Sequence, residues 1–387
     1  MELRGYQRRD GRWGFRNHVL VLPLHAAACA ATEVVARTFP GVVTVGHDWT
    51  GRGDEADIGR VERVFLGFAT HPNVGATLLV GLDDQSASLV ESAVSTSDRV
   101  AFLSLRDCGG TLPTIARAKS VVRSLIDESD ALERTVAPVS SLCLALECGG
   151  SDALSGITAN PALGSASDLL VAAGGTSILG ETSELIGAEH LLAARAVTDA
   201  VAGQLVGMID RFELSANALG VDLRGGQPVP GNMAGGLTTI EEKSLGAAKK
   251  GGSAPIQAVL DYATTPQRAG LHVMDTPGND IEQMVGMVAA GCQVVAFTTG
   301  RGTPTGSPIA PCLKISSNTS VFTRLRDDVD LNAGSMLDGG ESLSSAGRRI
   351  FDAIVAAANG EPTASERHQN REFSVSRENP RWTPVGV

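Results

Sequence analysis

The sequence predicts an α/β fold in which an open parallel sheet is followed by a larger α/β domain. The main observation is that short, unbroken apolar runs alternate with helical stretches of ten or more residues, which is typical of parallel βαβ units. In addition, the chain has 45 Gly and only 4% aromatic residues, which favours many short loops over a sandwich or a solenoid. Its 387 residues, 43% of them hydrophobic, suffice for about two domains.

Four strand–helix units are predicted in the N-terminal third. The apolar runs are residues 19–24, 42–45, 76–82 and 100–105, and helical stretches follow to about residue 38, then over 57–69, 86–95 and 113–129. This order predicts a doubly wound, Rossmann-like domain over residues 1–135. No GxGxxG motif follows the first run, so the evidence for a dinucleotide site is weak.

The segment before these units, residues 1–17, contains five Arg interleaved with Gly and aromatic residues. Such a segment could be an arm that binds carboxylate or phosphate groups, or a solvated chain end.

A second α/β domain is predicted over residues 136–365, followed by a polar tail over residues 366–387. The expected strands are 139–146, 177–179, 271–274, 293–297 and 311–315, and the expected helices are 188–218, 280–290 and 343–358. Residues 221–236 are rich in Gly and Pro and are expected to be irregular.

Potential ligands and acid/base groups follow the predicted strands. Because ligands of open parallel sheets bind beyond the carboxyl ends of the strands, such groups mark a possible site. In the N-terminal domain they are His25, Cys29, His47, Asp48, Asp83, Asp84, Asp107 and Cys108. His47 is the best candidate among them, the alternative being an ordinary loop His.

The polar stretch from Glu147 to Pro161 stands out in the second domain. Its polar groups follow neither a two-residue nor a 3.6-residue period, so we expect neither a core strand nor an amphipathic helix there. Paired Gly residues after a strand let backbone amides approach a ligand closely. The stretch is therefore either a Gly-rich turn with a buried structural Cys or the floor of a site.

Composition excludes several classes of function. A formal charge of −11 without a long basic run argues against nucleic-acid or anionic-membrane binding. No apolar run reaches the roughly 18 residues that span a bilayer, and residues 1–18 do not resemble a signal peptide. We therefore expect a cytoplasmic protein. Its six Cys show no CxxC spacing, which favours free thiols or single ligands over disulfides.

Two functions suit these groups. The first is an enzyme that removes a proton next to the carboxylate of a small anionic hydroxy acid, with a carboxylate or His as base. A divalent cation on oxygen or imidazole ligands would stabilise the enediolate, and Arg301 and Lys243 would hold the substrate carboxylate. The second function is binding by the same pocket without chemistry.

Several strings resemble one known family, the altronate and galactarate dehydratases, which also includes the large subunit of sulfolactate sulfo-lyase. The resemblance covers its catalytic part, from about residue 5 to 365. The strings are residues 5–17, His71-Pro72-Asn73-Val74, Glu147 to Pro161, Gly187-Ala188-Glu189, Gly231-Asn232, Glu241 to Gly246, Asp275-Thr276-Pro277-Gly278 and Phe297 to Gly302.

The resemblance implies a lyase. A sugar acid would lose its C2 proton and C3 hydroxyl to give a 2-keto-3-deoxy acid, or sulfolactate would lose sulfite. It also implies a divalent metal ion (Fe²⁺, Mn²⁺ or Mg²⁺), and it makes a separate small subunit plausible. We further expect a homo-oligomer, most simply a dimer.

The chain departs from the family pattern in two places. His47-Asp48-Trp49-Thr50-Gly51-Arg52-Gly53 replaces His-x-x-Gly-Cys-Gly, and Gly81-Leu82-Asp83-Asp84-Gln85 replaces Gly-Leu-Gly-Cys-Glu. Two expected thiols are thus absent, while Cys148 is kept. Because thiolates favour soft metals and carboxylates harder ones, we expect a metal shell richer in oxygen than in typical members, or no metal on this edge. The departures also raise the possibility of another substrate or of lost dehydratase activity.

We assign roles to sixteen residues on this basis. The predicted catalytic residues are Asp275, Lys243, Glu241, Arg301 and Glu181. The predicted substrate contacts are Gly149, Gly150, Ser151, Thr158, Asn160, Thr298 and Thr299. The predicted metal ligands are Cys148, Asp152, His47 and Glu184.

Overall fold

The N-terminal part folds around a four-stranded parallel sheet. A computed structural model describes residues 2–83 and 87–378 and gives this sheet the order β4-β3-β5-β6. Helix α1 packs with α4, and α2 packs with α3, so the sheet is doubly wound as predicted. β5 is buried along its whole length because helices cover the sheet. The elements are β3 His18–Pro23, α1 Cys29–Thr38, β4 Val43–Thr44, α2 Glu55–Ala69, β5 Val74–Gly81, α3 Ala87–Thr96, β6 Val100–Ser104 and α4 Thr111–Asp130.

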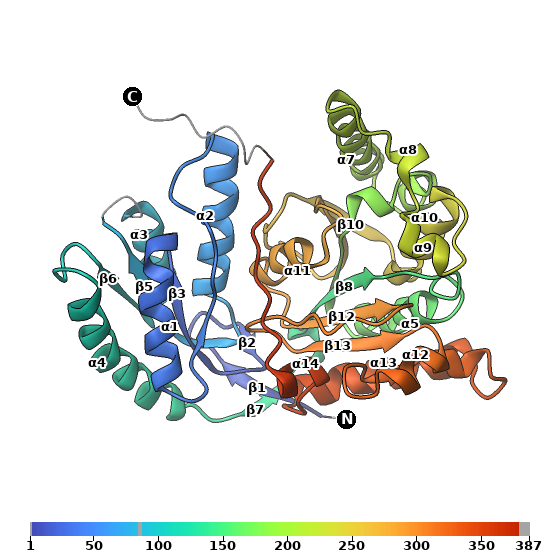
Figure 1. The fold of residues 1–387 in the computed structure, drawn as a ribbon. Coiled ribbons are helices and arrows are strands. Elements are labelled where there is room, and N and C mark those ends of the chain that lie inside the picture. Colours follow the sequence, from blue (N-terminus) through green and yellow to red (C-terminus); the bar gives the residue numbers. More distant parts are fainter. Residues whose placement is uncertain (1, 84–86, 379–387) are drawn as a thin grey trace.

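The C-terminal part contains a seven-stranded sheet, all of whose neighbouring strands are parallel, in the order β10-β11-β9-β8-β12-β13-β14 (Figure 1). The α/β class is thereby confirmed. Its strands are β8 Cys143–Gly149, β9 Thr176–Leu179, β10 Ile256–Leu260, β11 Gly270–Met274, β12 Val294–Thr299, β13 Cys312–Ser316 and β14 Leu331–Asn332.

Helices from the same part pack around this sheet. Helices α5 and α13 pack against each other and over β12. The α-helices are α5 Ala159–Ala172, α6 Glu189–Ala193, α7 Asp199–Ala218, α8 Leu223–Gly226, α9 Pro230–Ala234, α10 Ile240–Ala248, α11 Asp280–Ala289, α12 Thr319–Arg324, α13 Leu343–Ala358 and α14 Ala364–His368. Short 3₁₀ turns are η1 Ala26–Ala28, η3 Val139–Ser141, η4 Thr182–Glu184, η5 Lys249–Gly251 and η6 Gly334–Met336.

The Arg-rich N-terminal segment is built into the fold and is not a solvated chain end. β1 (Leu3–Gln7) pairs with β2 (Trp13–Gly14) and with β7 (Thr135–Ala137) in a small antiparallel sheet. Arg8 is buried and donates hydrogen bonds to the Pro72 and Arg16 carbonyls, because a buried guanidinium must satisfy its N–H groups within the protein. No periodic apolar pattern marks these short strands in the sequence.

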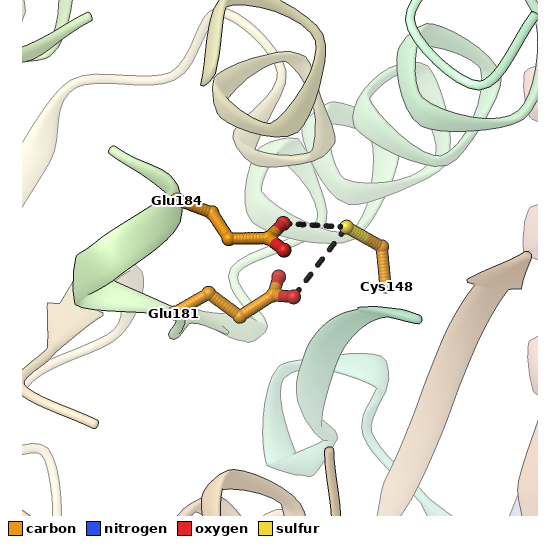
Figure 2. Close-up of side chains that lie close together, drawn as sticks. All are labelled: Cys148, Glu181 and Glu184. Atoms are coloured by element: carbon orange, nitrogen blue, oxygen red, sulfur yellow. Dashed lines mark hydrogen bonds between the residues drawn. The ribbon is translucent and has the colours of Figure 1, made fainter. Parts of the chain in front are cut away.

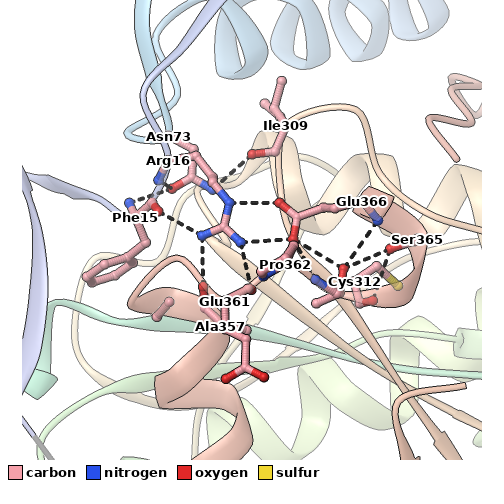
Figure 3. Close-up of polar contacts among 12 residues, drawn as sticks. Phe15, Arg16, Asn73, Ile309, Cys312, Ala357, Glu361, Pro362, Ser365 and Glu366 are labelled. Atoms are coloured by element: carbon pink, nitrogen blue, oxygen red, sulfur yellow. Dashed lines mark hydrogen bonds and ion pairs between the residues drawn. The ribbon is translucent and has the colours of Figure 1, made fainter. Parts of the chain in front are cut away.

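Arg16 joins the N-terminal segment to α13 and α14. Its guanidinium donates to both carboxylate oxygens of Glu366 in α14, at 2.7 and 2.9 Å, and to the carbonyl of Ala357 (Figure 3). The Asn73 side chain, close by, accepts from the Phe15 N–H and donates to the Ile309 carbonyl. The two parts of the molecule are therefore held together by polar contacts that involve both ends of the sequence.

The polar tail proves to be partly structured. Residues 364–368 form α14, and residues 369–378, here called the C-terminal strap, run back along α2 (Figure 1). Phe373 packs edge-on against Phe68, with ring centroids 5.0 Å apart, and Arg377 pairs with Asp48. The strap therefore contacts the chain's own N-terminal part.

Three further expectations were wrong in detail. The helix expected over 188–218 is split into α6 and α7, because Val197 donates to the Ile256 carbonyl and Thr198 caps α7. The region 221–236 contains two single-turn helices, α8 and α9. The Glu147–Pro161 stretch is not all irregular, since β8 extends to Gly149 by pairing with β12 and α5 begins at Ala159.

All six cysteines are free, as predicted. Within the described residues, no helix is both long enough and apolar enough to cross a bilayer.

Candidate active site

A buried group of potential ligands lies at the carboxyl ends of β8 and β9. Cys148 is near the end of β8, and Glu181 and Glu184 follow β9 in and beside η4. Cys148 Sγ lies 3.4 Å from Glu181 Oε1 and 3.3 Å from Glu184 Oε2 (Figure 2). One donor atom from each residue lies within 4.8 Å of the other two. Three residues that were predicted separately thus converge on one point, here called the Cys–Glu cluster.

Two lysines neutralise the carboxylates of this cluster. Lys250, in η5, forms an ion pair with Glu181, and both side chains are almost completely buried (0% and 2% exposed). Lys243, on α10, lies 2.8 Å from Glu184 and also donates to Gln227 at 3.1 Å. Glu181 has a left-handed backbone (φ 69°), which non-Gly residues rarely adopt and which often marks functional sites. These contacts fix the orientation of both carboxylates.

Two further acids adjoin the cluster, of which Glu147 is buried and Asp280 is half-buried. Glu147, at the end of β8, is fully buried, and burial followed by the charge of Asp280 raises its pKa well above the usual value. Gln283 of α11 donates to one of its oxygens, and the other has no hydrogen-bond partner among the described residues. Asp280, at the start of α11, has its pKa raised to about 6, first by burial and then by Glu184.

Burial also affects the thiol. It raises the pKa of Cys148 to about 12, with the negative charge of Glu184 as the next cause. Ser151 Oγ lies 3.5 Å from its sulfur. In the absence of a bound metal ion, this side chain is therefore a neutral thiol at pH 7 and a poor nucleophile, despite the nearby Lys250 ammonium.

These residues fit a divalent cation. Four carboxyl groups (Glu147, Glu181, Glu184 and Asp280) share only two lysines, so the group has an excess of potential negative charge in a buried place. The unpartnered oxygen of Glu147 adds a further unsatisfied acceptor. Buried polar groups of this kind usually have a partner, and carboxylates together with a cysteine that loses its proton on metal binding can hold Fe²⁺ or Mn²⁺.

Asp152, predicted as a metal ligand, is placed differently. Its carboxylate accepts hydrogen bonds from Ser155 at 2.7 Å, from Ser317 at 2.8 Å and from Asn318 at 3.0 Å. It is not part of the Cys–Glu cluster, and its donors hold the 151–157 loop against the β13 end. Both oxygens are thus already used in building the loop.

Several predicted substrate contacts also bond within the protein. The Thr158 hydroxyl donates to the Ser317 carbonyl, and Asn160 accepts from the Thr298 hydroxyl at 2.6 Å and donates to the Gly246 carbonyl. The Thr299 hydroxyl accepts from the Gly302 N–H. These groups position the loop backbones around the site.

Gly149 and Gly150 lie in close contact with the side chains of Asp280 and Arg301, respectively. A Cβ on Gly149 would overlap the Asp280 carboxylate, and Gly150 has φ 60° and faces Arg301. The Arg301 guanidinium reaches α9 at Gly231, and among the described residues no carboxylate lies within ion-pairing distance of it. It is therefore available to a ligand anion.

The remaining candidates lie around or away from the cluster. Asp275 accepts from the Thr182 hydroxyl at 2.9 Å and lies 3.9 Å from Arg211, and burial raises its pKa. Glu241 is exposed and packs on Gly187. His47 lies in the loop after β4, in the N-terminal part, where its ring bonds the Pro23 carbonyl and lies 5.0 Å from the Phe65 ring. Burial lowers its pKa.

Sequence reasoning missed Glu147 as a site acid, together with Asp280, Gln283 and Lys250. Lys250 was inconspicuous because it lies in a Lys-Lys-Gly-Gly turn, where a charged residue is ordinarily solvated. Asp280 comes five residues after Asp275 and near the same strand end, and this position could have indicated Asp280 as a site residue. The second departure from the family pattern, residues 81–85, includes Asp84 and Gln85, which lie outside the described residues.

Comparison with known proteins gives matches along nearly the whole chain. Residues 139–381 match the family described as D-galactarate/Altronate dehydratase, C-terminal, and residues 5–130 match D-galactarate dehydratase/Altronate hydrolase, second domain.

Individual relatives show the same likeness. The (2R)-sulfolactate sulfo-lyase subunit beta of Chromohalobacter salexigens is 35% identical, covering 96% of each chain. Altronate dehydratase of Escherichia coli is 33% identical over 97% of this chain and 77% of its own. Galactarate dehydratase (L-threo-forming) of Escherichia coli is 37% identical over 73% of this chain, which spans about half of that relative (53%).

Proposed function

Because the chain belongs to the D-galactarate/altronate dehydratase family, we propose that it is a lyase that eliminates water from a small sugar-acid or hydroxy-acid anion to give a 2-keto-3-deoxy acid. The observation that supports this most is the buried Cys–Glu cluster, which lies within the part of the chain that matches the family's C-terminal domain. A site of buried, oriented carboxylates suits removal of a weakly acidic proton.

We assign the cofactor as a divalent cation held by Cys148, Glu181 and Glu184, of which Fe²⁺ or Mn²⁺ suits the mixed donor set best. When bound, it would supply Lewis-acid stabilisation of the enediolate. The two lysines hold the carboxylates in place, so Glu181 and Glu184 present their remaining oxygens in fixed directions.

The residues of the chain then divide the reaction as follows. Arg301 binds the substrate carboxylate, since its guanidinium can form a bidentate pair. Asp280 takes the C2 proton, because a carboxylate with a pKa of about 6 is ionised at pH 7 yet basic enough to accept it. The electron pair of the broken C2–H bond forms the enediolate, the C3 hydroxyl leaves as water with a proton from a site acid, and the enol tautomerises to the 2-oxo acid.

A second candidate is elimination of sulfite from sulfolactate. It is favoured by coverage: the chain matches 96% of the sulfo-lyase subunit beta but only 77% of the altronate dehydratase. Both reactions start from the same proton abstraction, so the same residues would serve. The name of that relative indicates that it has another subunit, and we propose that this chain also works with a small partner subunit.

One experiment tests these proposals. The chain is loaded with Fe²⁺, Mn²⁺ or Mg²⁺ and offered altronate, galactarate and sulfolactate, while 2-oxo acid and sulfite are measured. Glu184→Gln should reduce both bound metal and turnover, whereas Glu33→Gln, on the exposed face of α1, should change neither. Turnover that survives Glu184→Gln with metal content unchanged would contradict the assignment of the cluster.

A further inference from the structure

A second possible ligand site lies in the N-terminal sheet. In this sheet β4 lies on one side of β3, and β5 and β6 lie on the other. The connection that follows β3 therefore runs to one side of the sheet, and the connection that follows β5 runs to the other. In open parallel sheets this reversal of strand order opens a crevice at the carboxyl edge, where ligands bind. Two adjoining cavities of about 270 and 370 Å³ open at this edge, and His25, Leu82 and Asp83 line both of them. Together they are called the switch-point cavity.

The inner part of the switch-point cavity is mainly apolar. Its lining includes Leu24, Trp49, Ile58, Phe65 and Leu89, with Glu62 as an acid at its margin. Trp49 is 7% exposed, so its indole is part of the cavity wall and not a surface group. Such a space favours an apolar body.

The outer part presents hydrogen-bond donors and positive charge. Arg52, Arg106 and His25 line it. Arg106 is paired with Asp83 at 2.6 Å, so this acid is already neutralised. No ion pair involves Arg52 among the described residues. His25 Nδ1 accepts the Ala27 N–H at 3.0 Å, which leaves Nε2 to carry the proton of the neutral ring and to act as a donor.

We propose that the switch-point cavity binds a small organic anion whose apolar body lies against Trp49 and whose head group is held by Arg52, with Arg106 and His25 beside it. A guanidinium recognises carboxylate and phosphate by the same two-pronged geometry, so the chemistry of the head group is shared by both ligand classes. The cavity belongs to a different sheet from the Cys–Glu cluster. None of its lining residues belongs to the Cys–Glu cluster, so the proposed binding function is additional to the proposed lyase reaction.

The test uses the full chain with benzoate, phenyl phosphate and uncharged benzyl alcohol as probes in calorimetric titrations. At least one of the two anions should bind and benzyl alcohol should bind at least about tenfold more weakly, since a charge-assisted hydrogen bond is lost. The stronger anion identifies the head-group class. Arg52→Ala should weaken the anion by about tenfold or more, and the matched control Arg37→Ala, on exposed α1, should leave its affinity unchanged.

The position of the ligand is tested by tryptophan fluorescence. Saturating anion should change the emission of the unsubstituted protein, and the change should disappear in Trp49→Phe. Lyase turnover should be the same in Arg52→Ala as in the unsubstituted enzyme, so a failure of this proposal is distinguishable from a failure of the proposed function. Absence of binding by both anions, equal binding of benzyl alcohol, or equal losses in Arg52→Ala and Arg37→Ala would overturn it.

Discussion

Lys250 is the residue on which the local electrostatics of the Cys–Glu cluster depend most. Its ammonium has no exposure to solvent, and it faces a carboxylate that is equally buried. A buried pair of this kind contributes little net stability, but removing one partner leaves an uncompensated charge.

Lys250→Met should therefore destabilise the fold by about 3–5 kcal/mol, while Lys250→Met combined with Glu181→Gln should recover most of the loss. Urea unfolding of both variants and of Glu181→Gln alone, without added metal, measures this. Equal stability of the single Lys250 variant and the double variant would show that Glu181 is not charged in the apo protein.

Substitution of Gly149 tests the proposed role of Asp280 as the base. An added methyl group would displace the Asp280 carboxylate from its place beside β8. Gly149→Ala should lower turnover by about 100-fold, because displacement by about 1 Å is enough for such a loss. Gly46→Ala, where a Cβ meets nothing within 4 Å, is the matched control. Unchanged turnover in Gly149→Ala would remove Asp280 from the proposed mechanism.

At the residue scale, the sequence predicted which side chains lie together better than it predicted what each of them contacts. Cys148, Glu181 and Glu184 follow strands and lie together, as strand-end position led us to expect. Asp152 and Asn160 have equally suitable chemistry and nearby positions, but their side chains bond to the protein itself. Whether a polar side chain faces the site or bonds within the protein depends on its neighbours in three dimensions. The sequence alone could therefore not distinguish these two groups of residues.

The turn between α2 and β5 shows how a short element joins the two parts of the molecule. His71 Nδ1 accepts the Asn73 N–H at 3.0 Å, and its Nε2 lies 3.2 Å from the Cys292 carbonyl. The ring is thus held in its neutral form, with Nε2–H donating. Burial, with the charge of Arg12 as the next cause, lowers the pKa of His71 from 6.5 to about 3.

This depressed pKa predicts acid sensitivity. The unfolded chain takes up a proton at His71 below about pH 6.5, whereas the folded chain does so only near pH 3, so stability is lost as the pH falls through that window. At pH 5 the loss from this group should be about 2 kcal/mol. Unfolding at pH 7.5 and 5.0 should show a smaller pH difference for His71→Gln than for the unsubstituted protein. The control variant His190→Gln, at an exposed position, should have the same pH difference in unfolding free energy as the unsubstituted protein. The same pH difference in His71→Gln would contradict the assignment of the acid sensitivity to His71.

Elements with a strong apolar period were predictable, and those without one were not. β5 is a run of eight buried residues and was found nearly in place. α5 was missed because Asn160, Pro161 and Gly164, near its start, are residue types typical of turns. Gly164 is required there because a Cβ would overlap the Lys249 carbonyl. β1 and β2 were missed because their Arg-rich surroundings suggested a solvated segment.

At the scale of the whole molecule, the C-terminal strap fastens the two parts together. Phe373 contacts Phe68 and His47, and Glu378 accepts from the Arg60 guanidinium. Phe373→Ala should lower the free energy of unfolding by about 2 kcal/mol, less than the 3–5 kcal/mol of a fully buried ring, because this ring is half-buried. Arg371→Ala, at an exposed strap position, is the control. Equal stabilities by urea unfolding would mean that the strap does not contribute.

The overall architecture followed from the alternation of strands and helices, while the contacts between distant segments did not. Nothing in residues 1–17 indicates that Arg16 bonds Glu366, because the two lie 350 residues apart and neither belongs to a periodic pattern. The division at residues 135 and 365 stays a prediction.

The pairing of Arg16 with Glu366 also affects the order of events during synthesis. Residues 3–17 emerge from the ribosome long before α13 and α14 exist, so the doubly wound sheet can form while Arg16 still lacks its partners Ala357 and Glu366. Only when residues 357–366 have been made can these contacts form. A segment that is translated late therefore completes one that is translated early, and a chain truncated before α14 would leave the Arg-rich N-terminal segment exposed to chaperones and proteases.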